Sequence, residues 1–192
     1  MFRRGLMRVL ETPRLLMRPI AMSDLEVVHR LHTDPLVVQS LFSGEAPARQ
    51  DTQEKVELYV RSWQENGFGF FSVFVKGSRD QAEFAGRAGL RRFEGTNDVE
   101  YGLCLFEHMA GRGFGPELGQ AILRHAFEKL GLDRVVALIR QENERAIRAS
   151  QKIGFNHIED RHYGDQVKGF YEVRASQYGL TDRSGGPGRN AG

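Results

Sequence analysis

The amino-acid sequence predicts a single α/β domain built on a mixed β-sheet, and two observations lead to this prediction. Three strand patterns follow one another in the middle of the chain with short turns between them, which is typical of an antiparallel meander. A helical pattern then separates the last of these strands from a continuous apolar run at residues 134–140. Strands joined through a helix are expected to be parallel, so the sheet should contain both kinds of pairing.

The first half of the chain should contribute one strand and two helices before the meander. Residues 14–20 have the pattern of a short strand. One helix is expected from about residue 23 to a stop at Pro35, and a second from about residue 51 to a stop at Gly67. Side chains that can cap a helix stand at both starts: Ser23, Asp24, Asp51 and Thr52.

The second half should alternate strands and helices after the meander. A helix is expected to end near Gly131, and another to begin at Asn143, which can cap it, and to close at Gly154. The expected strands are 68–76, 83–93, 98–106, 134–140, 155–163 and 169–178, and the expected helices are 116–130 and 143–154.

The composition excludes several classes of protein. The formal net charge of +2 is too small to indicate nucleic-acid binding, and the arginines of 87–95 (RAGLRRFEG) are expected on a solvated face. Cys104 is the only cysteine, so an internal disulfide is excluded, and the six histidines lack metal-ligand spacing. No apolar run approaches the roughly 20 residues of a membrane span, and no signal peptide is evident. We therefore expect a cytoplasmic enzyme or binding domain with no membrane partner and no metal.

The ends of the chain differ in composition from its middle. Residues 1–10 are expected to form an N-terminal extension and 11–178 the folded domain. Residues 179–192 form a polar, glycine-rich tail with almost nothing to bury, so we expect it to be flexible.

Three glycines in five residues, Gly111, Gly113 and Gly115, open onto the helical pattern after the meander. Helix N-termini attract phosphate, and glycine lets backbone N–H groups surround an anion, so the segment could cradle a phosphate. It could equally be a tight turn. A dinucleotide fingerprint would require an early βαβ unit, and a P-loop would require Gly-Lys-Ser/Thr. Neither pattern is present here.

The run 103–115 (LCLFEHMAGRGFG) resembles the strand–loop–helix core of the GNAT N-acetyltransferases, whose signature is Q/R-x-x-G-x-G/A. Gly113 and Gly115 match its glycines, whereas Ala110 departs from its first position. Residues 143–155 (NERAIRASQKIGF) resemble the family's later asparagine segment. Residues 11–37, with DVEYGL, resemble the RimJ/RimL-type branch, which acetylates the N-termini of ribosomal proteins. The resemblance extends from Glu11 to Tyr178.

This resemblance implies the GNAT fold, an α/β domain with a mixed central sheet, antiparallel N-terminal strands and helices on both faces. It implies acetyl-CoA as co-substrate and an amine acceptor, either a protein N-terminus or a small molecule, and it allows a homodimer. The main chain of Leu103 and Leu105 would contact pantetheine. The implied pyrophosphate loop is Ala110, Gly111, Arg112, Gly113, Phe114 and Gly115. Asn143 would cap its helix, contact the pantetheine arm, or do both.

Acetyl transfer to an amine needs an unprotonated amine, a polarised thioester carbonyl and a proton for the leaving thiolate. Glu100 lies in an otherwise apolar strand, so it is either a general base facing a cleft or a structural carboxylate. Ser150 stands where many GNAT enzymes carry a proton-donating tyrosine, while Ala146 replaces the serine frequent in the RimJ/RimL-type branch. Ser150 would donate a proton or bond to the helix carbonyl four residues back. Tyr163 or solvent would be the remaining donor.

Three functions remain open on the sequence. The first is an N-acetyltransferase that transfers the acetyl group directly, with Cys104 as a small buried residue rather than a nucleophile. The second is a non-catalytic acyl-CoA sensor on the same fold, suggested by the departures at Ala110 and Ala146. The third is a nucleotide-binding module.

Overall fold

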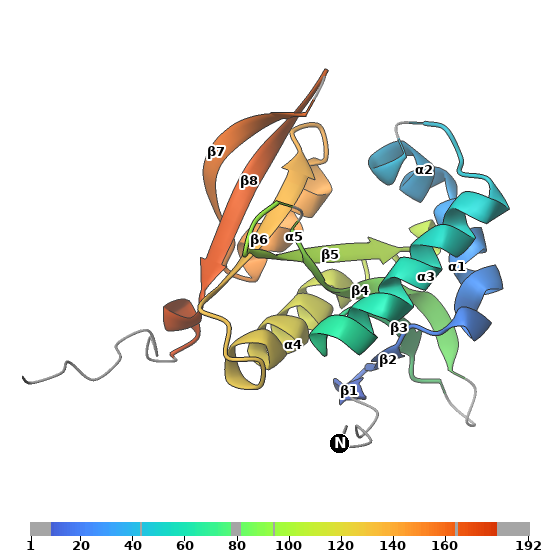
Figure 1. Ribbon diagram of the computed structural model, residues 1–192, viewed down its shortest axis with the longest axis horizontal. Helices are drawn as coiled ribbons and strands as arrows, with labels where there is room; N and C mark the ends of the chain where they lie inside the picture. The colour runs from blue at the N-terminus through green and yellow to red at the C-terminus, as the bar shows by residue number, and fades with distance from the viewer. Residues whose placement is uncertain (1–8, 43, 78–81, 94, 164, 180–192) are drawn as a thin grey trace, which may run out of the picture.

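The computed structural model describes residues 9–42, 44–77, 82–93, 95–163 and 165–179, so the predicted tail 179–192 lies outside them except for Gly179. Figure 1 shows the chain and its elements. The strands are β1 (Leu10–Glu11), β2 (Leu15–Pro19), β3 (Phe70–Val75), β4 (Glu83–Arg92), β5 (Val99–Leu105), β6 (Arg134–Arg140), β7 (Asn156–Tyr163) and β8 (Gln166–Arg174). The helices are α1 (Leu25–His32), α2 (Pro35–Leu41), α3 (Arg49–Asn66), α4 (Phe114–Glu128) and α5 (Glu144–Lys152), with short 3-10 helices at Met22–Asp24, Glu107–Met109 and Ala175–Tyr178.

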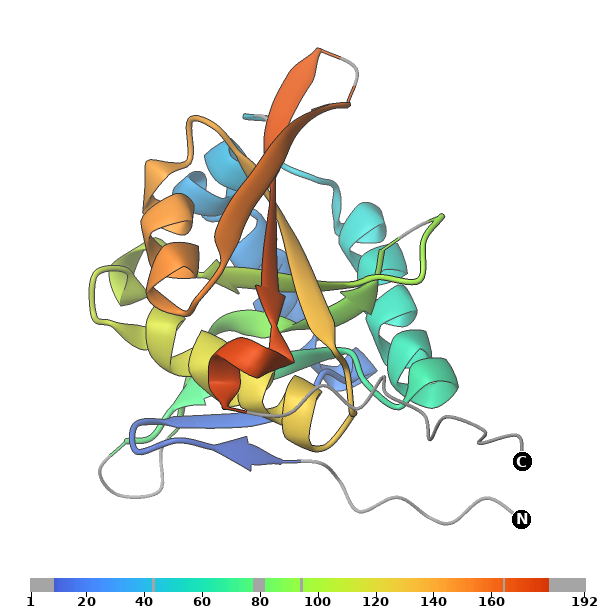
Figure 2. The same cartoon turned by 90° about the vertical axis from the view of Figure 1, so that its left-hand side faces the viewer.

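The strands form one eight-stranded mixed sheet in the order β1-β2-β3-β4-β5-β6-β8-β7. Within it β5 and β6 pair in parallel, and the other neighbours pair antiparallel. The predicted meander is β3, β4 and β5, and α4 is the predicted crossover to β6. Figure 2 shows the β7–β8 hairpin extending beyond the rest of the sheet. The predicted α/β fold with antiparallel N-terminal strands is confirmed.

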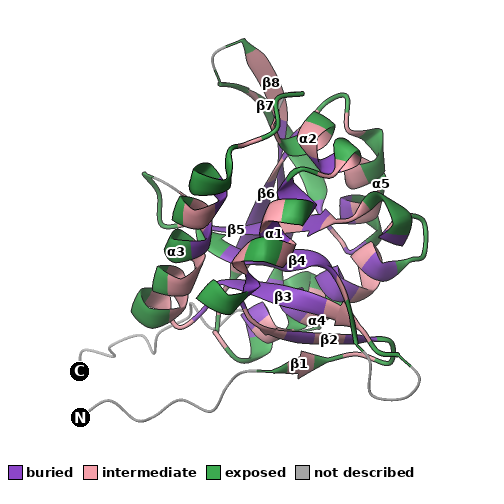
Figure 3. Ribbon diagram, turned by 90° about the vertical axis from the view of Figure 1, so that its right-hand side faces the viewer, coloured by how far each residue is buried: buried purple, intermediate pink, exposed green. Residues whose placement is uncertain are grey.

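Helices cover both faces of this sheet, as the alternation of the strands requires. On one face, Leu118 and Ile122 of α4 pack with Ala88 and Leu90 of β4 in the main hydrophobic core. On the other face, helices α1 and α3 bury Val28 and Val56 in a second cluster that also contains Phe70 of β3. Figure 3 shows the buried strands β3 and β4 between these layers. The described residues include no helix long and apolar enough to cross a membrane.

Helix α2 was not predicted, because Pro35 was expected to end a helix and instead begins one. Proline is tolerated in the first turn, where its missing N–H would have no intrahelical partner. The Asp34 side chain caps α2 by accepting a hydrogen bond from the Leu36 amide at 3.1 Å. The segment therefore breaks and restarts at Asp34 and Pro35, and α2 becomes a wall of the site described below.

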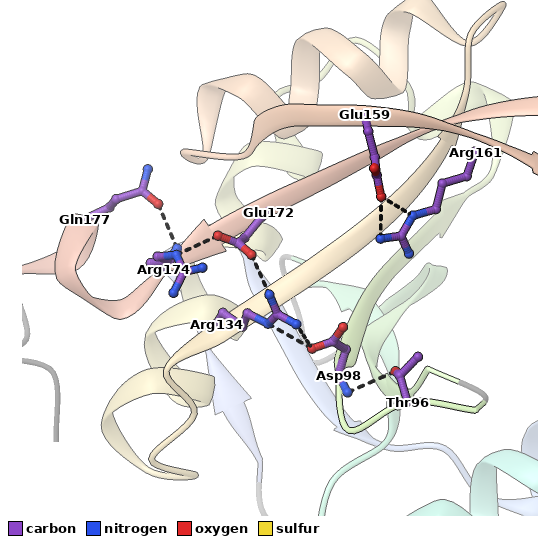
Figure 4. A network of polar contacts seen from close by, with 8 residues as sticks. All are labelled: Thr96, Asp98, Arg134, Glu159, Arg161, Glu172, Arg174 and Gln177. Atoms are coloured by element: carbon purple, nitrogen blue, oxygen red, sulfur yellow. Dashed lines mark hydrogen bonds and ion pairs between the residues drawn. The ribbon is translucent and has the colours of Figure 1, made fainter. Parts of the chain in front are cut away.

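An ion-pair network ties β5 and β6 to β8 at the start of the parallel pair (Figure 4). The Arg134 guanidinium lies 2.6 Å from a carboxylate oxygen of Asp98, just before β5, and 2.9 Å from Glu172 of β8. Arg174 pairs with the same Glu172 at 2.6 Å. Because Arg134 contacts both neighbouring segments, it fixes this end of β6 while the other end is free to diverge from β5.

Candidate active site

A cleft of about 670 Å³ opens where β5 and β6 separate. The two strands are in register only at Glu100 and Val136 within the described chain, and Figure 1 shows them pointing in different directions. The cleft continues between α2 and α3 on one side and the start of α4 and α5 on the other. All of the predicted site residues except Arg112 line it: Glu100, Leu103, Leu105, Ala110, Gly111, Gly113, Phe114, Gly115, Asn143 and Ser150.

The glycine loop has a backbone that requires glycine at two positions. Gly111 has φ +74° and Gly113 has φ +79°, both in the left-handed region. No atom lies within 4 Å of the place where a Cβ on Gly111 would stand, so the loop is open on that side. Gly113 is the N-cap of α4, which begins at Phe114 rather than at Pro116 as predicted. The first amides of α4 and the glycine loop thus lie together at one end of the cleft.

The loop is held from outside by Arg14, which precedes β2. The Arg14 guanidinium donates to the Arg112 carbonyl at 2.8 Å and pairs with Glu117 of α4 at 2.6 Å. Burial raises the pKa of Glu117, but hydrogen bonds from Thr12 and Arg14 outweigh it and lower that pKa overall. Arg112 itself stacks on the Phe114 ring, with its guanidinium 4.8 Å from the ring centre, and does not line the cleft.

Leu103 and Leu105 lie on β5 beyond the registered pair with Val136. On their other side they pair with β4, opposite Ala88 and Gly86 respectively. The β5 edge that faces β6 therefore passes along the cleft instead of being taken up by the neighbouring strand. A free strand edge can hydrogen-bond an extended ligand through its main chain.

Helix α5 presents Asn143, Ala146 and Ser150 to the cleft on one helix face. The Asn143 side chain accepts a hydrogen bond from the Ala146 amide at 3.1 Å, so its predicted N-cap role is confirmed. The buried Ser150 hydroxyl donates to the Ile147 carbonyl at 2.8 Å, three residues back rather than the four expected. Its oxygen can still accept a hydrogen bond from the cleft.

Glu100 is buried, with 6% of its surface exposed, at the point where β5 and β6 separate. One of its carboxylate oxygens lies 2.7 Å from the guanidinium of Arg91, which is directly opposite on β4 and also lines the cleft. The carboxylate is thus held by an ion pair at its surface side while its strand faces the cleft. Both readings of Glu100, structural partner and general base, are compatible with this position.

Cys104 also lines the cleft, but its surroundings disfavour a thiolate. Burial among Leu31 and Val37 raises the pKa of the thiol to about 11. A thiol is a weak nucleophile unless it is deprotonated. Tyr163 lies near the end of β7, outside the cleft lining, with the Lys168 ammonium 5.2 Å from its ring centre. The described residues contain no group of three or more His, Cys, Asp or Glu side chains placed to hold a metal ion.

Sequence reasoning missed the far side of the cleft. All three arginines of 87–95 were expected to face solvent. This is wrong for Arg87, which is buried and lines the cleft. It is correct for Arg91 and Arg92, which are both exposed. Tyr59 of α3 and Phe70 of β3 stand beside Arg87. These partners come from distant segments, so no local pattern marked them. The one available signal was an arginine in a strand of otherwise small and apolar residues.

The sequence model described as "Acetyltransferase (GNAT) domain" matches residues 14–156. The chain belongs to the GNAT acetyltransferase family. It is 26% identical over 143 residues to the uncharacterized N-acetyltransferase YnaD of Bacillus subtilis, which covers 74% of this chain and 79% of YnaD. The family and these relatives indicate that the protein is an acetyltransferase enzyme, and enzymes of this family use acetyl-CoA.

Solved structures agree with this fold. An acetyltransferase from Agrobacterium tumefaciens superposes with a TM-score of 0.76 at 23% identity, covering 90% of this chain and 99% of the other. RimL, the ribosomal L7/L12 alpha-N-protein acetyltransferase in complex with coenzyme A, superposes with a TM-score of 0.74 at 18% identity, covering 87% and 98%. At these identities the likeness is one of fold.

Proposed function

We propose that this protein transfers the acetyl group of acetyl-CoA directly to a primary amine, within the RimJ/RimL-type branch of its family. The observation that carries the proposal is the single cleft that joins the glycine loop, the free edge of β5, Glu100 and Ser150. A binding groove alone would need only the first two. The presence of a carboxylate on β5 and a hydroxyl on α5 in the lining of the same cleft supports catalysis and argues against a non-catalytic sensor.

The residues proposed to hold acetyl-CoA are Leu103, Leu105, the loop 110–115 and Asn143. Backbone N–H groups at a helix N-terminus favour phosphate, and the left-handed Gly111 and Gly113 allow the loop to curve around it. Ala110 replaces a side chain that the family usually places here, and a main-chain grip tolerates that replacement. The Asn143 side-chain oxygen already accepts the Ala146 amide, so its amide nitrogen is the group directed to a ligand.

The proposed catalytic residues are Glu100 and Ser150. Glu100 would accept the proton of the amine, directly or through a water, before or during attack on the thioester carbonyl. Ser150 would hydrogen-bond the leaving thiolate and pass a proton to its sulfur while taking one from a water in the cleft, so that the hydroxyl is restored. Acetyl-CoA contributes the activated thioester, and the chain contributes orientation, proton transfer and exclusion of water.

Two measurements test the proposal. Isothermal titration should show acetyl-CoA binding, and the absence of binding at millimolar ligand would refute it. A thiol-release assay with a panel of amines and peptides should then show acetyl-CoA-dependent turnover, and binding without turnover of any amine would favour the sensor.

A substitution links this turnover to Glu100. Glu100→Gln should lower kcat at least tenfold, because general-base catalysis is typically worth ~10²–10⁴ in rate, with little change in acetyl-CoA affinity. Glu83→Gln is the matched control, since Glu83 lies exposed on β4 outside the cleft lining. Equal loss of activity in both variants would contradict a specific role for Glu100.

A further inference from the structure

Arg87 is a buried cation that lines the cleft. It lies in the middle of β4 with 5% of its surface exposed and is among the residues that line the cleft. Across the antiparallel ladder it stands directly opposite Cys104, as Arg91 stands opposite Glu100. Directly paired residues project from the same face of a sheet. Since Glu100 and Cys104 are four residues apart on β5, Arg87 and Glu100 project from the same face of the sheet on neighbouring strands.

Three side chains hold the guanidinium of Arg87 in one orientation. Its Nε donates to Nε2 of the buried His32 at 3.2 Å, and arginine can only donate, so His32 accepts as the neutral ring. The guanidinium carbon also lies 4.7 Å from the ring centre of Phe70 and 5.1 Å from that of Tyr59. The ring centres of Phe70 and Tyr59 are 4.7 Å apart, so both rings lie on the same side of the guanidinium, and the arrangement uses Nε and that side of the group. It leaves the terminal pair of nitrogens for another partner.

No carboxylate neutralises Arg87 within the part of the chain that the structure describes. Other arginines of the domain behave differently: Arg18 pairs with Asp24, Arg91 with Glu100, and Arg134 with Asp98. Lys55 of α3 lines the same region of the cleft and likewise has no ion pair among the described residues. A buried charge without a partner is costly, so such a group usually marks a place where a ligand supplies the opposite charge.

We propose that Arg87 binds a carboxylate group of the amine acceptor. The two terminal nitrogens of a fixed guanidinium match the two oxygens of a carboxylate, which is the pairing that arginine favours. Lys55 adds positive charge nearby, but its ammonium group cannot bind both oxygens of a carboxylate in the planar geometry that a guanidinium offers. The acceptor would therefore be an amine that also carries a carboxylate, such as a β- or ω-amino acid or a peptide with an acidic residue at its N-terminus. This inference rests on the proposed function, because it describes the substrate of the same site.

The register constrains how such a molecule lies. Cys104, opposite Arg87, is four residues along β5 from Glu100, which corresponds to about 13 Å between their Cα positions. The carboxylate would bind toward the Cys104 end of β5 and the amine would point back toward Glu100. Acceptors whose amine and carboxylate are separated by several bonds should therefore be better substrates than α-amino acids.

The wild-type enzyme provides the first test, with acceptors that differ only in the carboxylate. The pairs are β-alanine with propylamine, 5-aminopentanoate with pentylamine, and tripeptides that begin with Asp or Glu with those that begin with Asn or Gln. We expect kcat/KM to be at least tenfold higher for the carboxylate member of each pair. Comparing the small amino acids with the tripeptides shows whether the site prefers a small molecule or a peptide. Equal values would overturn this inference alone. Failure to acetylate any amine would overturn the proposed function, and this inference with it.

Substitutions at Arg87 provide the second test. Arg87→Gln should remove the preference for the carboxylate member mainly through KM, while Arg87→Lys should keep part of it because charge remains but the fork is lost. The control is Arg92→Gln, since Arg92 lies on the same strand and over the ring of Phe68, outside the cleft lining. A preference that persists in a folded Arg87→Gln variant would contradict the proposal.

A third measurement is independent of whether these variants fold. Glutarate should inhibit the wild-type enzyme competitively against the acceptor and not against acetyl-CoA, whereas the matched diol, 1,5-pentanediol, should not inhibit. Inhibition by both compounds, or by neither, would contradict carboxylate binding at Arg87.

Discussion

Glu100 and Val136 are the residues at which β5 and β6 are in register, and beyond them the two strands separate. Arg134, the first residue of β6, pairs with Asp98 and Glu172 and holds the start of β6 against its neighbours. The two strands therefore separate only toward their C-terminal ends. The same residue that marks the start of the cleft, Glu100, is the carboxylate proposed as general base. The separation of β5 and β6 thus opens the cleft and places the Glu100 carboxylate where the two strands begin to separate.

Gly113→Val should weaken acetyl-CoA binding at least tenfold. The space beside Gly113 is not tightly closed, because a Cβ there would lie 3.4 Å from the Arg14 guanidinium. The main effect should come from the φ of +79°, which a β-branched residue adopts only with strain, so the loop would change its path. The measurement is isothermal titration with acetyl-CoA.

The control for this prediction is Gly95→Val. Gly95 has φ +74° and open space around it, but lies in the turn before β5, away from the cleft lining. It should show a comparable backbone penalty in thermal unfolding and wild-type affinity for acetyl-CoA. Unchanged affinity in a folded Gly113→Val variant would refute the phosphate role of the loop.

Arg134→Met should lower the melting temperature by several degrees, because it removes one cation from between two carboxylates, Asp98 and Glu172. Leaving those acids near each other without their shared partner adds repulsion to the lost attraction. Arg124→Met is the control, since Arg124 makes a single surface pair with Glu128 at 3.8 Å, and such pairs contribute little. Equal shifts in the two variants would show that the network of Figure 4 does not stabilise the junction.

Cys104→Ala should retain kcat within a few-fold of the wild type. Burial raises the pKa of the thiol to about 11, so very little thiolate exists at neutral pH and covalent transfer through Cys104 is disfavoured. Some stability should be lost, because the side chain packs against Leu31 and Val37. Intact-protein mass spectrometry after incubation with acetyl-CoA should show no acetylated enzyme. An acetyl adduct that disappears in Cys104→Ala would establish a covalent route instead.

His32 should make the protein less stable as the pH falls below 6.5. Burial, with Arg87, Lys55 and His29 nearby, lowers the pKa of His32 to about 3. Between these values the unfolded chain binds a proton that the folded protein does not, so the free energy of unfolding decreases by up to ~1.4 kcal/mol per pH unit. Urea unfolding of the wild type from pH 7 to 4.5 measures this slope.

His32→Gln should reduce that slope, since glutamine can still accept from Arg87 and does not titrate. His108→Gln is the control, because His108 is exposed and lies outside the clusters of the core. If the wild type and His32→Gln lose stability in parallel with falling pH, the shifted pKa of His32 is not the cause.

The parts of the fold that could be predicted from the sequence are those encoded by local patterns. The glycine loop, the Asn143 cap and the strand–helix alternation each depend on residues close together in the chain. The start of α2 was missed because proline both ends and begins helices, and Asp34 decides between the two. Arg87 was missed because its burial depends on His32, Tyr59 and Phe70, which tertiary packing alone brings together.

Ser150→Ala should lower kcat at least tenfold and leave acetyl-CoA affinity nearly unchanged. The Ser150 hydroxyl lies in the cleft on the same helix face as Asn143, where it can contact a leaving thiolate, directly or through a water. In the structure it donates to the Ile147 carbonyl at 2.8 Å, so it must rotate to donate elsewhere. That rotation has a low barrier, and general-acid assistance is typically worth ~10²–10⁴ in rate. The measurement is steady-state thiol release from pH 6 to 9.

Two further variants separate catalysis from packing at this position. Ser150→Thr keeps the hydroxyl and should recover most of the turnover. Ser62→Ala removes a hydroxyl that also donates to a backbone carbonyl, that of Phe68 at 2.9 Å, but outside the cleft lining, and it should leave kcat unchanged. Wild-type turnover in Ser150→Ala across the whole pH range would exclude Ser150 as donor. Because Tyr163 lies outside the cleft lining, solvent would then be the source of the proton.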